Sequence, residues 1–155
     1  SAMQLVILSS ALLAASVASA AQQSIGARGQ LMCGDQPLAN ADVKLWLLHT
    51  FPRPDTNLAT VKTDAQGRFQ VSGTDSSMFT LDPAVRFYHR CNNKGLFDIP
   101  NLCQRESTYK IPSSYISSSG QVQRWYEMGT MNMEAKQKGE ETHCASNPIR
   151  AIGRR

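Results

Sequence analysis

The fold class is decided by the stretch Ala41-Asp42-Val43-Lys44-Leu45-Trp46-Leu47-Leu48-His49. Apolar residues occupy every second position from Ala41 to Leu47, and the positions between them begin with the charged Asp42 and Lys44. Because successive side chains of a strand point to opposite faces, this alternation predicts a β-strand with one face in a core. Trp46 lies on the second face, which we therefore expect to be half covered.

Runs of the same kind lie before and after this stretch and are separated by turn-forming residues. They are residues 24–32, 58–63, 68–72, 85–90, 104–111, 122–128 and 131–135. Asp64-Ala65-Gln66-Gly67 is a tight-turn sequence, and Gly129-Thr130 predicts a hairpin between the last two runs. Only residues 76–82 have the character of a helical turn. About eight short strands predict an all-β fold, namely a two-sheet antiparallel β-sandwich of seven to eight strands.

Composition and charge restrict the class of protein further. The chain has 155 residues and a mass of 17.0 kDa, which predicts a single domain. With 41% hydrophobic and 18% charged residues, the chain is too apolar to be disordered. A net charge of +4 and a pI near 9.0 are modest beside the charge of an arginine-rich arm, so no nucleic-acid partner is expected.

The first residues are typical of a targeting segment. Residues 1–2 resemble a cloning remnant ahead of Met3, an apolar run follows over residues 5–15, and Ala18-Ser19-Ala20 fits a small-x-small cleavage site. A core helix or a membrane anchor is the alternative, but the run is shorter than the about 20 residues that span a bilayer. We therefore expect a signal peptide within residues 1–20, the sandwich over 21–144, a basic flexible tail over 145–155, no transmembrane segment, and a secreted, extracellular protein.

The cysteines predict two disulfide bonds. There are four of them, Cys33, Cys91, Cys103 and Cys144, an even number that suits an exported protein. Three pairings are open. We expect Cys91–Cys103, because these two residues bracket a polar loop between two predicted strands, and therefore Cys33–Cys144. A four-cysteine zinc site is the alternative, but the sequence contains no CxxC pair.

Other reactive side chains do not form a known catalytic or metal-binding pattern. His49, His89 and His143 are not paired at a ligand spacing, and His89 alternates with apolar residues, which predicts a packed histidine. The adjacent Glu140 and Glu141 are expected in solvent. Neither G-x-S-x-G nor H-E-x-x-H occurs. We therefore expect no catalytic residue, no metal and no cofactor.

Basic residues provide a candidate site for an anionic head group. The residues concerned are Arg86, Arg90, Arg105 and Lys110. They lie on the two predicted strands that flank the loop between Cys91 and Cys103, and such cations bind phosphate and carboxylate groups by charge-assisted hydrogen bonds. The alternative is an ordinary solvated sheet face, balanced by Asp98 and Glu106.

An ordered set of short motifs runs through this pattern. It comprises residues 23–26 (QSIG), 29–34 (GQLMCG), 43–46 (VKLW), 63–69 (TDAQGRF), 88–92 (YHRCN), 103–105 (CQR) and 129–134 (GTMNME), followed by Cys144. Over residues 22–144 the set resembles the nematode transthyretin-like family of secreted proteins. The resemblance implies a transthyretin-like sandwich of seven to eight strands and an extracellular location, with no shared catalytic motif. The hydroxyisourate hydrolases, an enzymatic branch of the transthyretin fold, carry a Tyr-Arg-Gly-Ser ending that this chain lacks.

Three functional hypotheses follow. The best understood role in the family is an extracellular bridge that recognises phosphatidylserine on dying cells and links it to a phagocyte receptor. The first hypothesis is therefore a non-enzymatic recognition protein whose partner in apoptotic-cell engulfment is an anionic phospholipid surface or a cell-surface receptor. The second is a carrier of a small apolar ligand in a transthyretin-like subunit interface. The third and least favoured is a hydroxyisourate hydrolase-like enzyme.

Overall fold

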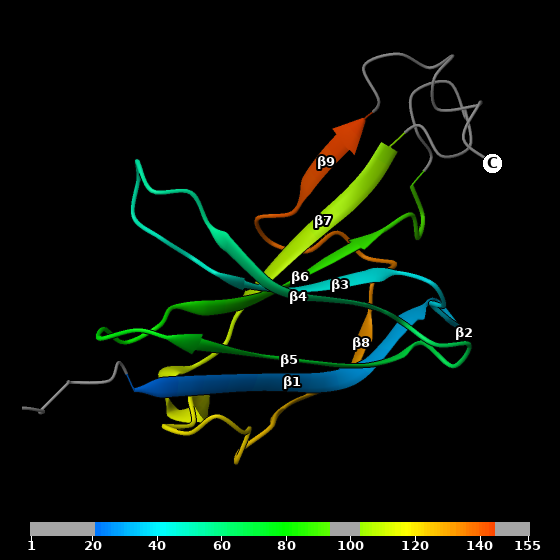
Figure 1. The fold of residues 1–155 in the computed structure, drawn as a ribbon. Coiled ribbons are helices and arrows are strands. Elements are labelled where there is room, and N and C mark those ends of the chain that lie inside the picture. The colour runs from blue at the N-terminus through cyan, green and yellow to red at the C-terminus, as the bar shows by residue number, and fades with distance from the viewer. Residues whose placement is uncertain (1–20, 94–102, 145–155) are drawn as a thin grey trace, which may run out of the picture.

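The protein is a β-sandwich in the computed structural model, which describes residues 21–93 and 103–144 (Figure 1). In one sheet β1 pairs with β2, β5 and β8, and the second sheet has the strand order β4-β3-β6-β7-β9. The strands are β1 (Gln22–Cys33), β2 (Gln36–Pro37), β3 (Asp42–Leu47), β4 (Thr56–Lys62), β5 (Arg68–Ser76), β6 (Pro83–His89), β7 (Cys103–Lys110), β8 (Tyr126–Asn132) and β9 (Glu141–Cys144). The predicted all-β sandwich is thus confirmed.

The core lies between the two sheets and follows the predicted alternation. Val43 and Leu45 of β3 are fully buried, whereas Lys44 and Trp46 on the other face are half-buried. From the opposite sheet, Phe69 places its ring edge-on to Phe87 of β6 with a centroid separation of 5.2 Å. The apolar period of two therefore positions β3, β5 and β6 on the core, because their alternate side chains face the other sheet.

The turn at residues 64–67 also forms as predicted. The backbone N–H of Gly67 donates to the carbonyl of Asp64 at 2.9 Å. Gly67 has a φ of +76°, and a Cβ built there would lie 2.1 Å from the carbonyl oxygen of Leu31. Glycine is required here both by its left-handed backbone and by this close approach to β1.

The C-terminal hairpin prediction is wrong. Instead of turning at Gly129-Thr130, the chain runs straight through these residues as β8, which pairs parallel to β1 from Ala27↔Tyr126 to Met32↔Asn132. The pairing register shifts at Arg28/Gly29, and Gly129 takes a φ of +68° beside this irregularity. A glycine that sequence reasoning assigned to a turn therefore serves a β-bulge, and the sandwich is not wholly antiparallel.

No helical turn forms at residues 76–82. Strand β5 continues to Ser76, and the side-chain amide of Gln23 then donates to the carbonyls of Ser77 and Phe79. These two hydrogen bonds favour a non-helical conformation, because they engage backbone carbonyls that would otherwise accept hydrogen bonds within a helical turn. A short 3-10 turn occurs elsewhere, at Ser113–Tyr115.

Both disulfide bonds form, but the predicted pairing is wrong. The bonds are Cys33–Cys91 and Cys103–Cys144. The first joins the end of β1 to the residues just after β6 and so connects the two sheets. The second joins directly opposed residues of β7 and β9, with a Cα–Cα distance of 3.9 Å. The sequence did not show that β9 lies beside β7. Because it does, Cys144 of β9 forms the disulfide bond with Cys103.

Several sequence predictions concern segments outside the described residues. The proposed signal peptide (residues 1–20), the basic tail (residues 145–155) and Asp98 all belong to those segments. Within residues 21–93 and 103–144, the structure contains no helix long and apolar enough to cross a membrane.

Candidate functional site

The four basic residues do not gather at one place. The pairing of β6 with β7 sets Lys110 opposite Ala84 at one end and Arg105 opposite His89 at the other. Strand β6 has seven residues, so its ends are about 20 Å apart. Lys110 and Arg86 lie toward the first end, whereas Arg90 and Arg105 lie toward the disulfide-bonded end. A single head-group site therefore does not use all four.

Arg86 is held by carboxylates on the outer face of its sheet. Its Nη2 lies 2.7 Å from Oδ2 of Asp55 and its Nε lies 3.5 Å from Oε1 of Glu106, while the guanidinium stacks 5.0 Å from the Trp46 ring centroid. The backbone N–H of His49, followed by the Arg86 guanidinium, lowers the pKa of Asp55. The charge of Arg86 is thus largely neutralised within the protein.

Arg105 is a buried structural cation. Its side chain is 7% exposed and forms a two-pronged ion pair with Glu140, Nε to Oε1 at 2.5 Å and Nη2 to Oε2 at 2.8 Å. Nη1 donates to the carbonyls of Cys91 and Met133, each at 2.7 Å, and Nη2 donates to Ala135 at 3.0 Å. The guanidinium therefore has no free donor to offer a ligand.

Glu140 corrects the prediction that both adjacent glutamates are solvated. Its side chain is only 2% exposed, whereas that of Glu141 is 71% exposed. The hydrogen bonds from Arg105 are the main cause that lowers the pKa of Glu140. The alternation of Cys103, Arg105 and Ser107 against Gln104, Glu106 and Thr108 was the available signal, since it places Arg105 on the core face.

His89 is a packed histidine, as predicted. It is 3% exposed, and its Nδ1 accepts a hydrogen bond from the backbone N–H of Cys91 at 3.1 Å. Burial, followed by the positive charge of Arg105, lowers the pKa of His89 to about 4. The ring is therefore neutral at physiological pH, with its proton on Nε2.

Two neighbouring loops at one end of the sandwich expose large apolar side chains, a feature that sequence reasoning missed. Phe51 is 91% exposed in the β3–β4 loop, and Met78 and Phe79 are 85% and 80% exposed in the β5–β6 loop. Both loops project from the same end of the molecule (Figure 1). The N–H of Leu48 donates to the carbonyl of Asp82 at 2.8 Å and ties the loops together at their base. We call Phe51, Met78 and Phe79 the apolar loop end.

A cavity of about 480 Å³ separates these loops. Its lining includes Thr50 and Arg53 from the first loop, and Ser77, Phe79 and Asp82 from the second. One cation of the predicted head-group site reaches this region, since Nζ of Lys110 lies 3.0 Å from Oδ2 of Asp82. The apolar loop end is thus flanked by two exposed cations, those of Arg53 and Lys110.

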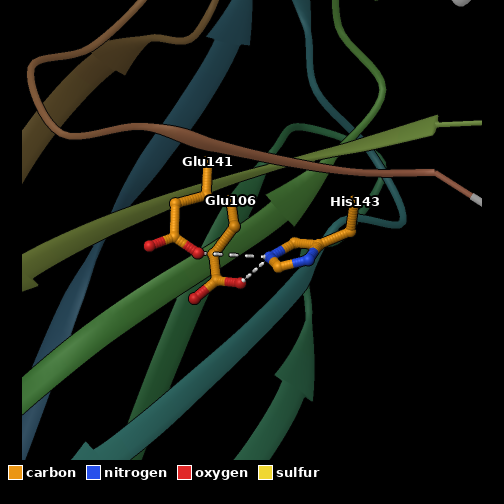
Figure 2. A group of neighbouring side chains, drawn as sticks. All are labelled: Glu106, Glu141 and His143. Carbon is orange, nitrogen blue, oxygen red and sulfur yellow. Dashed lines mark hydrogen bonds and ion pairs between the residues drawn. The ribbon is translucent and has the colours of Figure 1, made fainter.

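A second cluster lies on the outer face of the five-stranded sheet. Glu106 of β7 stands opposite Glu141 of β9, and His143 follows two residues later on the same face (Figure 2). Nε2 of His143 is 2.6 Å from Oε2 of Glu106 and 3.7 Å from Oε2 of Glu141. Sequence reasoning treated these residues separately, because their proximity depends on the register of two strands far apart in the chain.

Comparison with known proteins identifies the family. A model described as the transthyretin-like family matches residues 28–112, from within β1 to just beyond β7. The chain belongs to the transthyretin-like family.

Individual transthyretin-like relatives agree with this assignment. The chain is 41% identical to transthyretin-like protein 33 of Caenorhabditis elegans over 79% of its own length and 82% of the relative. It is 35% identical to transthyretin-like protein 46 over 77% and 64%, and 34% identical to transthyretin-like protein 5 over 79% and 84%, both from the same organism. These names specify no ligand. Glu140, Glu141 and His143 lie beyond the family match.

Proposed function

We propose that this transthyretin-like chain is a secreted, non-enzymatic recognition protein that docks on a phosphatidylserine-containing membrane. The observation that carries the proposal is the apolar loop end, where three large apolar side chains from two adjacent loops are at least 80% exposed. Gathered apolar exposure of this kind marks interaction surfaces in soluble proteins.

The loop end suits the interfacial layer of a membrane. A fully buried Phe or Met side chain contributes about 1.5–3 kcal/mol of binding free energy relative to an exposed one. Each nearby cation adds about 1 kcal/mol at an anionic surface, so the three apolar side chains contribute more than the two cations. Arg53 and Lys110 would face head groups when the three apolar tips enter the interface. Asp75 and Asp82 line the same cavity and oppose the local attraction, whereas the net charge of +4 favours approach to an anionic surface.

Secretion and the absence of enzymatic activity have separate support. All four cysteines are in disulfide bonds, which persist in oxidising compartments. The family that the sequence resembles has no shared catalytic motif that could be mapped onto this chain. Because the best understood role in that family is recognition of phosphatidylserine, this lipid is the first to test.

Co-sedimentation with vesicles tests this proposal. We expect binding to vesicles of phosphatidylcholine with phosphatidylserine, weaker binding to phosphatidylcholine alone, and loss of binding in the triple variant Phe51→Ser, Met78→Ser, Phe79→Ser. Arg90→Gln is the matched control, because Arg90 is exposed at the opposite end of β6 and should be silent. Unchanged vesicle binding by the triple variant would overturn the membrane proposal. Binding of the protein to cells but not to vesicles would also overturn it and would indicate a protein receptor.

A further inference from the structure

The two carboxylates and the imidazole of Figure 2 converge on one point. Nε2 of His143, an oxygen of Glu106 and an oxygen of Glu141 all lie within 4.8 Å of one another. The side chains of Glu141 and His143 are 71% and 54% exposed, whereas that of Glu106 is 14% exposed. One ligand position is therefore fixed against the sheet and the other two can adjust.

We propose that Glu106, Glu141 and His143 bind a zinc ion. One nitrogen and two carboxylate oxygens form a donor set that suits Zn²⁺, which in open sites takes three protein ligands and one water. With bonds of about 2.0–2.1 Å, tetrahedral ligands stand roughly 3.3–3.4 Å apart. The observed separations of 2.6 and 3.7 Å bracket that distance, so small rotations of the exposed Glu141 and His143 side chains complete the geometry.

The sheet itself favours a cation at this place. Glu106 and Glu141 stand directly opposite each other across the β7–β9 ladder, and like charges in opposed positions are destabilising. Arg86 relieves this repulsion only in part, because its Nε is 3.5 Å from Glu106 while its Nη2 is engaged by Asp55 at 2.7 Å. A divalent ion between the two carboxylates removes their repulsion and replaces the hydrogen bond between His143 and Glu106.

The disulfide bond next to the site preorganises it. Cys144 follows His143 directly, and its bond to Cys103 fixes β9 in register on β7. The ligand backbones therefore need no rearrangement to bind the ion. Calcium and magnesium suit the site poorly, because they prefer more oxygen ligands, whereas imidazole favours zinc and other late first-row metals.

Isothermal titration of the full chain with Zn²⁺ tests the site, after any affinity tag has been removed and metal has been stripped with a chelator. We expect one saturable equivalent, no competition from excess Ca²⁺ or Mg²⁺, and a weakening of roughly 10-fold or more in both His143→Ala and Glu141→Gln. His49→Ala is the matched control, because His49 is a half-buried histidine outside this cluster whose Nε2 is hydrogen-bonded to the Thr56 hydroxyl. Glu106 is left unchanged, since it also contacts Arg86.

Two further readouts exclude binding elsewhere on the surface. Zinc should raise the thermal midpoint of the parent chain and of His49→Ala but not of His143→Ala, and Co²⁺ should give the visible absorption of a tetrahedral centre. Absence of saturable binding, equal affinity in His143→Ala, or effective competition by Ca²⁺ would each overturn the proposal. The vesicle experiment tests Phe51, Met78 and Phe79, none of which belongs to this cluster, so either proposal can fail without the other.

Discussion

Replacing Arg105 tests the view that this residue belongs to the core. Arg105→Ala leaves the Glu140 carboxylate, 2% exposed, without its two-pronged partner, and it frees the carbonyls of Cys91, Met133 and Ala135. Removal of one partner of a buried ion pair costs about 3–5 kcal/mol. We expect the upper part of this range, because three backbone acceptors lose their donor in the same step.

Equilibrium urea unfolding without reductant measures this cost. A loss of this size lowers the denaturation midpoint without changing the slope and reduces the melting temperature by about 10–20 °C. Arg105→Lys provides a milder variant if the alanine chain fails to fold. The lysine keeps the charge but cannot form both prongs, so we expect a loss of about 1–3 kcal/mol.

A cost below about 1 kcal/mol for Arg105→Ala, typical of a surface ion pair, would refute the buried-cation argument. Acid unfolding gives an independent check. Because the pKa of Glu140 is lowered from 4.5 in the folded protein, its stabilisation is complete above that pH and is lost as the pH falls through the lower folded value. Glu140→Gln should remove this part of the acid dependence.

Two further predictions concern His89 and the disulfide bonds. The pKa of His89 falls from 6.5 to about 4 on folding, so between these pH values the unfolded chain binds a proton that the folded chain does not. The free energy of unfolding should therefore decrease by about 3 kcal/mol as the pH drops from the higher value to the lower one. An NMR titration midpoint of His89 near 6.5 would contradict this. Non-reducing peptide mapping should recover Cys33 linked to Cys91 and Cys103 linked to Cys144, and the double variant Cys33→Ser, Cys91→Ser should lose about 4 kcal/mol. A peptide pair joining Cys91 to Cys103 would show that the pairing is wrong.

The sequence predicts those parts of the fold that depend on local alternation. The run around Val43 and the run around Phe87 each place apolar side chains at every second position, and the structure buries the predicted faces. The turn at Gly67 was predictable for the same reason, since its chemistry is contained in four neighbouring residues. The course of strand β8 was not predictable, because a glycine such as Gly129 suits both a hairpin turn and a β-bulge. Only the pairing with the parallel strand β1 decides between the two.

The candidate sites depend on long-range placement and were therefore only partly predictable. The head-group prediction treated Arg86, Arg90, Arg105 and Lys110 as one set because they are basic and lie on the two predicted strands that flank the loop between Cys91 and Cys103. The structure separates them, since strand direction places Lys110 and Arg105 at opposite ends of β7 and strand alternation turns Arg105 inward. Phe51 stands in one loop and the adjacent Met78 and Phe79 in another, and no periodic pattern indicates that the fold brings these loops together.

The β7–β9 register links the two clusters. With Cys103 opposite Cys144, Arg105 stands opposite Thr142 on the core face, and Glu106 stands opposite Glu141 on the outer face. The same pairing thus sets Arg105 beside Glu140, the residue just before β9, and sets His143 beside Glu106. A slip of β9 by one residue would exchange the faces of its side chains relative to β7, so the disulfide bond that fixes the register stabilises the buried ion pair and the proposed zinc site together.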